Sequence, residues 1–431
     1  MRLNPRVTAA LFVCAAVARA ADPALAEILA RLERLEGENA KLRQEIQELR
    51  SRLDGPPPVE ERVGVVEQRV EDQSQTKVES SQRVPVRLTG MLLFNAFSSG
   101  RNGVPPDFPT IATANRGPMM IRGTMRQTSI GIEVDSPYLI AGAQAHGRLI
   151  ADFYGTLDDY NTPRIRTGFL DLQWPSTGLR VGIEKPIVAP RSPSSLAQQI
   201  YPALWGMGNL WLWQPQARVE QKFTFGGNEL RAQAGLLQTN DGRAVSVASG
   251  VTLQPRPAWE GRLAFARRFE GDRAIEFAPG FHYSRTLASG TSVPSQLITG
   301  DWRIAPSHQW ELTGAFFTGR NAGPIGGLRQ GIVIVEPGSV RSVATTGGWS
   351  QLMYRPFDRL RFHVMAGQQD DRDSDLVRGA VGRNFSWIVN SMLQVSPNVL
   401  VGLEAQQIRT SYLGLGTRVL NRYDLALAYL F

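Results

Sequence analysis

The last nine residues of the chain alternate apolar side chains with small or polar ones and end on an aromatic ring. Neighbouring side chains of a β-strand point to opposite faces. One face would carry Tyr423, Leu425, Leu427, Tyr429 and Phe431. The other would carry Arg422, Asp424, Ala426 and Ala428. An apolar face opposite a face of small or polar side chains is typical of a membrane β-barrel strand. The pattern predicts that the apolar face of this segment contacts lipid.

The same alternation returns in segments of about ten residues from Val84 onward, separated by turn residues. Short turns are expected near residues 136–137, 175–178, 226–228, 270–272, 305–307, 355–358 and 396–398. Longer connections are expected around 98–123, 154–163, 188–213, 238–256, 287–294, 319–347, 370–375 and 410–418. Seven turns and eight longer connections predict sixteen strands, with both chain ends on the turn side. We therefore predict an all-β fold over residues 84–431, a 16-stranded antiparallel transmembrane β-barrel.

Three tryptophans, Trp174, Trp259 and Trp310, fall at or near the ends of predicted strands. An indole ring at a strand end suits the membrane interface, so these residues predict parts of an aromatic girdle. The alternative is that they are ordinary core tryptophans.

A different period governs residues 21–54, where apolar side chains recur at alternating spacings of three and four. The seam positions are Leu25, Ile28, Leu32, Leu35, Asn39, Leu42, Ile46, Leu49 and Leu53. This heptad repeat predicts an α-helical coiled coil, and oppositely charged flanking positions favour parallel self-association. Asn39 fixes the register without deciding between a dimer and a trimer. The alternative is an amphipathic helix that folds back onto its own barrel.

The first twenty residues combine Arg2 and Arg6, an apolar run of roughly a dozen residues and the small-residue triplet 18–20. This pattern predicts a secretory signal peptide over residues 1–20, which would remove Cys14, the one cysteine of the chain. Residues 55–58 read Gly-Pro-Pro-Pro and cannot continue a helix. We interpret residues 55–83 as a Pro-rich break followed by a short helical stalk in the periplasm.

Charge is distributed unevenly along the chain. Residues 84–431 contain 34 basic and 25 acidic side chains, whereas residues 1–83 contain 13 and 14. All but Lys185 and Lys222 of those 34 are arginines. Arginine binds carboxylate and phosphate groups with a two-pronged fork, so an arginine-lined channel would favour anionic solutes. The alternative is that many of these arginines face lipid headgroups or pair with carboxylates inside the barrel.

Assigning the apolar face of each strand to lipid leaves the other face to the lumen. The candidate residues for lining the lumen and binding solute are Arg148, Arg180, Arg191, Arg218, Lys222, Arg231, Arg262, Arg359, Arg361, Glu184 and Glu220. A barrel of sixteen strands is wide enough for an aqueous channel.

The third long connection is too apolar for a solvated loop tip. Residues 186–196 are rich in Pro and Ser, and residues 204–213 contain Trp205, Trp211 and Trp213 among glycines. We expect this loop to fold inward, pack against the inner wall and present Arg191 to solute. The alternative places the three tryptophans in the outer girdle or in a subunit contact.

Other candidate sites are weaker. Four aspartates between 370 and 375 could hold a divalent cation, although a solvated acidic loop is the simpler interpretation. The four histidines are too scattered to predict a zinc site. No grouping typical of catalysis and no cofactor-binding motif stands in the sequence, so we expect neither an enzyme nor a bound cofactor. Lipid-facing strands make nucleic acid an improbable partner despite the basic surplus.

The order of these features resembles a known family. After the signal peptide and heptads come Gln75-Thr76-Lys77-Val78-Glu79, the strand Val86-Arg87-Leu88-Thr89-Gly90 and the terminal Phe431. With this layout the chain resembles the DcaP-like trimeric outer-membrane porins and is more distantly similar to the phosphate-selective porins. The resemblance implies a trimeric sixteen-stranded channel with a periplasmic coiled coil that admits small anions such as dicarboxylates or phosphate. The scarcity of lysine departs from the lining expected of a phosphate-specific pore.

These observations predict a passive diffusion channel in the bacterial outer membrane for small, anionic, hydrophilic solutes. Its expected partners are outer-membrane lipid, two further copies of the chain in a homotrimer, and the solutes themselves. The competing hypothesis is a structural barrel anchor whose coiled coil contacts periplasmic partners.

Overall fold

The computed structural model describes residues 23–53, 85–103, 107–155, 162–239, 251–252, 256–288, 290–328, 331–336 and 339–431. The chain divides into two compact units, Met1–Arg83 and Val84–Phe431. The predicted signal peptide (1–20) and the predicted stalk (55–83) lie outside the described residues.

The described part of the first unit is a single helix, α2 (Pro23–Leu53). Its seam side chains Leu35, Leu42 and Ile46 are 50–55% exposed. The side chain of Asn39 donates to the backbone oxygen of Leu35, 3.3 Å away. Such a half-exposed apolar row is what a partner helix would cover in a coiled coil, and this association stays a prediction. Within the described ranges, no helix is long and apolar enough to cross a membrane.

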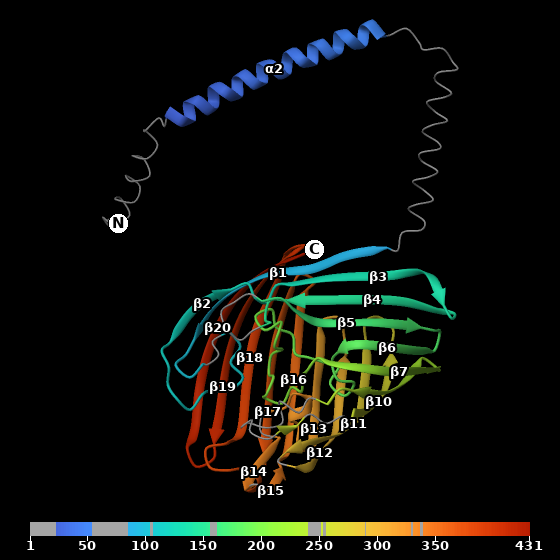
Figure 1. Ribbon diagram of the computed structural model, residues 1–431, viewed down its shortest axis with the longest axis vertical. Coiled ribbons are helices and arrows are strands. Elements are labelled where there is room, and N and C mark those ends of the chain that lie inside the picture. The colour runs from blue at the N-terminus through green and yellow to red at the C-terminus, as the bar shows by residue number, and fades with distance from the viewer. Residues whose placement is uncertain are drawn as a thin grey trace. The chain divides into compact units, whose positions relative to one another are not determined.

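The second unit is a closed antiparallel β-barrel (Figure 1). Its strands are β1 (Val86–Ser99), β2 (Met120–Thr124), β3 (Ser129–Ile140), β4 (Ala143–Asp152), β5 (Arg164–Gln173), β6 (Thr177–Glu184), β7 (Gln214–Phe225), β8 (Asn228–Leu237), β9 (Val251–Thr252), β10 (Ala258–Arg268), β11 (Ala274–Ala288), β12 (Thr291–Ala305), β13 (Trp310–Arg320), β16 (Ala344–Phe357), β17 (Leu360–Asp371), β18 (Val381–Ser396), β19 (Val399–Tyr412) and β20 (Gly416–Leu430). A separate hairpin, β14 (Ile332–Glu336) and β15 (Ser339–Ser342), and two short 3-10 helices, η2 (Gly323–Ile325) and η3 (Asp373–Asp375), lie in the connections.

Four of the eighteen strands in this sheet form two pairs, and the two members of each pair lie end to end in the wall as one strand. Strand β1 pairs with β3 along its first half and with β2 along its second, so β2 and β3 form one interrupted strand. Strand β9 likewise continues β10, because both pair with β11. Sixteen wall positions remain, which confirms the predicted strand number.

The wall closes where the first strand meets the last. Strands β1 and β20 pair antiparallel from Met91–Leu430 to Ser99–Arg422. The terminal Phe431 extends this pairing, because the Gly90 amide donates to its backbone oxygen at 2.9 Å and its own amide donates back at 3.2 Å. A side chain at Gly90 would collide with the Phe431 ring. The predicted final strand is therefore confirmed.

Burial confirms the predicted alternation of faces. On β20, Tyr423 is 61% exposed while its neighbour Arg422 is 1% exposed. On β17, Phe362 and Val364 are exposed and His363 between them is buried. Large apolar side chains dominate the exposed rows on strands around the wall, as expected of a surface that contacts lipid. Trp259 and Trp310 are also exposed at strand ends, the arrangement predicted for a girdle.

Three predicted connections are wrong. The turn expected at 136–137 lies at Ala141 and Gly142, and the register shift between Asp135 and Leu139 shows that Ser136 and Pro137 form a bulge inside β3. The long loops expected at 287–294 and 410–418 are absent from the described residues, because β11 runs to Ala288 with β12 starting at Thr291, and β19 runs to Tyr412 with β20 starting at Gly416. Strands β11, β12, β19 and β20 extend beyond their apolar alternation into polar residues, which have the composition of a loop.

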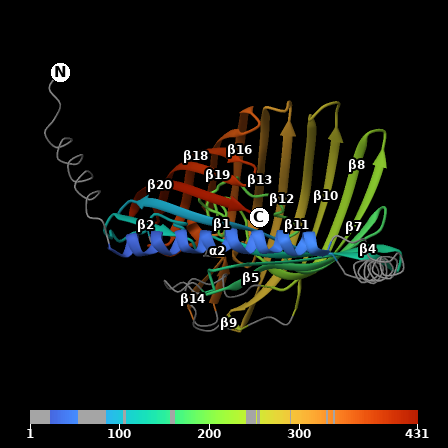
Figure 2. The same cartoon turned by 90° about the horizontal axis from the view of Figure 1, so that it is seen from above.

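The connection between β6 and β7, residues 185–213, fills part of the barrel interior and is called the inner loop below (Figures 1 and 2). Its side chains are almost all buried. Gly208 approaches the wall so closely that a Cβ atom there would overlap the backbone oxygens of Gly348 and Gln368, and its φ of +99° favours glycine. The predicted inward packing of this loop is confirmed.

Candidate functional site

The inner loop is attached to the wall by hydrogen bonds from strands all around the barrel. At its start, the Glu260 carboxylate on β10 accepts from the backbone amides of Ile187 and Val188. Further along, Ser195 donates to Glu404 on β19 at 2.5 Å. The backbone oxygen of Ala197 accepts from Asn95 on β1. A loop fixed on several sides of the wall sets the free space left inside the barrel.

Four charged side chains meet between the inner loop and the wall. Arg191 on the loop and Arg262 on β10 share two carboxylates, Asp301 on β12 and Glu276 on β11. Arg262 contacts Asp301 through two nitrogens at 2.7 and 2.8 Å, and Arg191 contacts the same carboxylate at 2.7 Å. Arg191 and Arg262, both predicted as lumen residues, thus lie together. Their partners Glu276 and Asp301 were not predicted as solute-binding residues. We call these four side chains the constriction network.

A second set of basic side chains lies on the wall from β4 to β7 and at the first residue of the inner loop. This basic sector consists of Arg148, Arg164, Arg166, Arg180, Lys185 and Arg218. Arg164 forms a two-pronged ion pair with Asp152 at 2.8 and 3.2 Å. Arg166 donates to the backbone oxygen of Gln199 in the inner loop. Both guanidinium groups lie over the Trp213 ring, at 5.3 and 5.0 Å from its centre.

Arg180 and Arg218 are direct cross-strand neighbours on β6 and β7. Arg180 pairs with Asp171 at 2.9 Å and with Glu184 at 3.4 Å. Within the part of the chain that the structure describes, Arg218 has no carboxylate within 4.0 Å. Like charges placed side by side are unfavourable, so an incoming anion would relieve this contact.

Lys185 stands where β6 passes into the inner loop. Its amino group lies 3.1 Å from the Ser192 hydroxyl, and burial is the main cause that lowers the pKa of the lysine. On β7 and β8, Lys222 and Arg231 both pair with Glu220, at 3.3 and 3.8 Å. Lys222, Arg231 and Glu220 are together more exposed than the constriction network.

Three further predicted lumen residues are Arg148 of the basic sector, Arg359 and Arg361. Arg148 pairs with Glu133 on β3 at 3.1 Å. Arg359 is exposed in the turn between β16 and β17, and Arg361 shares the inward row of β17 with His363. The structure therefore does not bring Arg359 and Arg361 to the inner loop.

Arg164 and Arg166 were not among the lumen residues predicted from the sequence. Ile165 between them is 57% exposed, so the Arg-Ile-Arg run has the alternation expected of a lipid-facing residue flanked by two inward ones. A register shift between Ile150 and Ala151 on the paired strand β4 interrupts the regular alternation near the start of β5.

The tryptophans of the inner loop belong to an interior aromatic cluster. Trp205 and Trp211 are 7% and 3% exposed and lie 5.4 Å apart, centre to centre. Tyr201 stacks on Trp205 at 5.0 Å, and Phe108 from another loop stacks on Tyr201 at 4.1 Å. Trp205 also donates to the backbone oxygen of Gly326. These contacts favour the interior interpretation over an outer girdle.

The aspartates between 370 and 375 point in different directions. Asp370 pairs with Arg383, while Asp375 accepts from the backbone amide of Ala344. Within the described ranges, no group of three or more His, Cys, Asp or Glu side chains is placed to hold a metal ion. The structure thus does not gather these carboxylates into a cation site.

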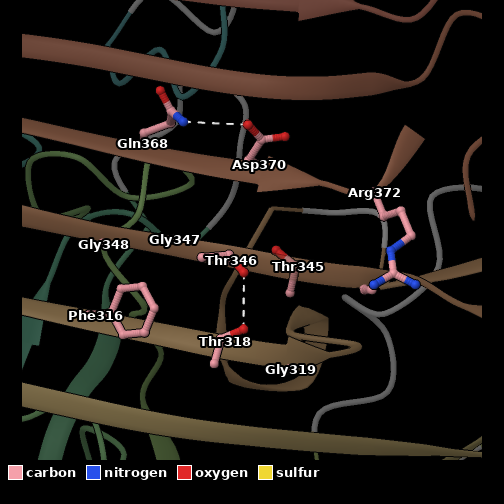
Figure 3. Close-up of a pocket in the computed structure, with 11 residues that line it drawn as sticks. Phe316, Thr318, Gly319, Thr345, Thr346, Gly347, Gly348, Gln368, Asp370 and Arg372 are labelled. Carbon is pink, nitrogen blue, oxygen red and sulfur yellow. Dashed lines mark hydrogen bonds between the residues drawn. The ribbon is translucent and has the colours of Figure 1, made fainter. Parts of the chain in front are cut away.

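A hollow of about 570 Å³ lies against β13, β16 and β17 (Figure 3). Thr318 and Thr346 are hydrogen-bonded at 3.0 Å along one side of it, and Gln368 reaches toward Asp370 along another. Thr318 shares the face of exposed Phe316, so these polar side chains belong to the outer surface of the wall. They lie apart from the constriction network.

No protein-family model and no curated protein sequence matches this chain. Solved structures do match. The outer membrane channel DcaP of Acinetobacter baumannii is 15% identical, with 81% of this chain and 97% of that chain covered and a TM-score of 0.68. An anion-selective porin from Comamonas acidovorans is 12% identical, with 81% and 100% covered and a TM-score of 0.57. The OprB structure of Pseudomonas putida is 10% identical, with 83% and 96% covered and a TM-score of 0.51. The chain has the fold of these barrels, which confirms the predicted DcaP-like resemblance at the level of fold.

Proposed function

We propose that this protein is an outer-membrane porin, a passive diffusion channel for small hydrophilic anions. The observation that supports this most directly is the constriction network. There an inward-folded loop places Arg191 beside Arg262 inside a barrel whose outer rows are apolar. The fold shared with the DcaP channel supports the same proposal. No catalysed reaction is needed for solute to pass.

The preference for anions rests on the balance of charge along the solute path. The basic sector has six cations, and the carboxylates paired with it are Glu133, Asp152, Asp171 and Glu184. Two positive charges remain in excess. Arginine keeps its charge at any physiological pH and holds carboxylate or phosphate groups with two parallel hydrogen bonds. Small dicarboxylates or phosphate are therefore the solute class we expect.

The paired arginines fit a diffusion channel better than a tight binding site. Each guanidinium of the constriction network already has protein carboxylate partners, so a passing anion exchanges contacts with them. Permeation requires binding that is favourable enough for entry and weak enough for release. Arg218, which has no such partner among the described residues, would attract anions toward this part of the wall.

We further propose that residues 1–20 direct export and that residues 21–54 form a parallel coiled coil in the periplasm. The apolar seam of α2 is half exposed in the single chain, and three copies would cover it. A trimer would place the three barrels side by side in the outer membrane, with their apolar rows against lipid or against one another.

Planar-bilayer recording of the purified full-length oligomer tests this function. We expect stepwise increases of current in potassium chloride, because each inserted barrel opens an aqueous path. A heat-denatured sample serves as the control for detergent artefacts. A folded oligomer that inserts and conducts no current would reject the channel and favour the structural anchor.

A further inference from the structure

A second group of arginines lies at the opposite end of the lumen from the long loops, where three short turns meet. A hollow of about 480 Å³ opens there. Its charged lining consists of Arg268, Arg273, Arg303, Arg355, Asp272 and Glu311, together with His308. The turns follow β10, β12 and β16. We call this hollow the vestibular pocket.

The register places two of its arginines on the inner face of the wall. Arg268 lies six residues after Arg262 on β10, and an even separation keeps both side chains on one face. Arg303 likewise lies two residues after Asp301 on β12. Arg262 and Asp301 belong to the constriction network, so these rows continue from it to the mouth of the barrel.

Arg355 on β16 also lies on the inner face of the wall. Arg355 lies four residues after Gln351 on β16, whose side chain bonds to Ser194 of the inner loop. The guanidinium of Arg355 donates to the backbone oxygen of His308 at 2.6 and 3.0 Å, which fixes one turn against the next. The Arg355 side chain also lines the pocket.

The pocket carries more positive than negative charge. Of its four arginines, Arg303 pairs with Glu311 at 2.7 Å. Among the residues that the structure describes, no carboxylate lies within 4.0 Å of the guanidinium groups of Arg268, Arg273 or Arg355. Asp272 is engaged by His308. Three guanidinium groups around one hollow therefore have no acidic partner, an arrangement suited to a doubly charged oxyanion.

We propose that the vestibular pocket binds a small divalent oxyanion, such as phosphate or a dicarboxylate, at the periplasmic mouth of the channel. This inference rests on the proposed porin function, which sets the orientation of the barrel and the anionic solute class. An anion that leaves the constriction network follows the inward rows of β10 and β12 to this pocket before release. The pocket acts as a separate site from the constriction, with its own affinity.

Block of chloride current by inorganic phosphate tests this site in bilayers that receive the protein from one side. We expect phosphate added on the periplasmic side to reduce the current at lower concentrations than phosphate on the other side. The reason is that only periplasmic phosphate reaches the pocket without crossing the constriction. Arg268→Gln should raise the half-blocking periplasmic concentration at least fivefold.

Two further variants make the result specific. Arg359→Gln removes the same charge from the same mouth at a position outside the pocket lining, and it should change the half-blocking concentration by less than twofold. Arg268→Lys keeps the charge and should recover most of the block. Equal block from both sides, or equal effects of the Arg268→Gln and Arg359→Gln variants, would overturn the proposal.

The anion preference of the proposed porin is measured on the same channels in a separate experiment. Zero-current potential in a potassium chloride gradient without phosphate reports the anion preference of the whole pore. An anion-preferring channel without sided block rejects the vestibular pocket alone. Sided block in a channel without anion preference would retain the pocket and reject the anionic selectivity.

Discussion

Inside this barrel, most arginines act in groups with carboxylates. In the constriction network, two guanidinium groups and two carboxylates balance one another in formal charge. Asp301 contacts both arginines and is itself buried, so its charge offsets the field of both. The selectivity of such a site depends on the carboxylates as much as on the arginines.

Asp301→Asn should increase the preference for chloride over potassium. The substitution leaves Arg191 and Arg262 with Glu276 as their shared carboxylate, so one positive charge becomes available to solute. The measurement is the zero-current potential in a potassium chloride gradient. Asp370→Asn makes the same charge change on the outer face of the wall and should leave that potential unaltered. Equal shifts in the two variants would contradict the role of Asp301.

His308 in the turn between β12 and β13 gives the barrel a pH-dependent contact. Its ring lies between Asp358, at 2.9 Å, and Asp272, and these carboxylates raise the pKa of the imidazole while Arg355 opposes them. The stabilisation is therefore fully present below the ordinary histidine pKa of about 6.5 and is lost as pH rises through the higher pKa of the folded protein.

We expect the thermal midpoint of the wild type to exceed that of His308→Gln at pH 5 and the difference to shrink toward pH 9. Subtracting the two midpoints cancels the titration of groups that do not interact with His308, and its partners Asp358 and Asp272 stay ionised across this pH range. Melting of the oligomer, followed by circular dichroism across this pH range, provides both values. A difference that stays constant or grows with pH would contradict a charged His308 in these turns.

The residues of the site could be predicted in part. Alternation along β7 correctly placed Arg218, Glu220 and Lys222 on one face. Partners across the barrel could not be predicted, because the meeting of Arg191 with Asp301 depends on the path of a loop, and strand period carries no information on that path. Arg359 was predicted to face the lumen because it alternates with Arg361 and His363. Strand β17 begins only at Leu360, so Arg359 lies in the turn before it.

At the scale of elements, the inner loop occupies space inside the barrel that would otherwise belong to the lumen. It passes close to the wall at Gly208, where two backbone oxygens leave no room for a side chain. Glycine is also required there by the positive φ. The loop can therefore lie flat against β16 and β17 at this point.

Gly208→Ala should displace this part of the inner loop and change the single-channel conductance. The added Cβ overlaps the backbone oxygens of Gly348 and Gln368, and the strained φ costs about 1–3 kcal/mol in addition. Gly226→Ala is a matched control, because Gly226 also has a positive φ but lies in a turn with open space around it. Conductance equal to wild type in the Gly208 variant would contradict close wall contact of the loop.

Strands were predictable because each repeats a local pattern, whereas turns depended on individual residues. The Gly226-Gly227 turn was found from composition, since both residues adopt the positive φ that a tight hairpin needs. Ser136 and Pro137 misled the prediction, because proline is tolerated in a bulge as well as in a turn. Polar strand extensions such as those of β11 and β12 had no signal that distinguishes them from loops.

At the scale of the whole molecule, two periodic patterns serve two different partners. The period of two in the barrel presents an apolar surface to lipid, while the heptad seam of α2 leaves an apolar row that the proposed coiled coil would cover. Each unit of the chain therefore has a surface that a single copy leaves exposed. Association through α2 would hold neighbouring barrels together.

Asn39→Ile should raise the temperature at which the full-length oligomer dissociates. A polar residue at a seam position costs stability in a coiled coil, and an apolar replacement removes that cost. The oligomer is heated to a series of temperatures and then cross-linked, and its gel mobility shows the temperature at which it dissociates. Gln44→Ile, on the same helix and outside the seam, should have little effect. An unchanged or lower dissociation temperature for Asn39→Ile would contradict a seam at this position.

The most direct test of the proposed function is the zero-current potential of the wild-type channel across a tenfold gradient of potassium chloride. We expect a potential with the sign of the chloride equilibrium potential, because the basic sector leaves an excess of positive charge along the path. A potential with the sign of the potassium equilibrium potential, or no current at all from folded, inserted protein, would contradict an anion-preferring porin.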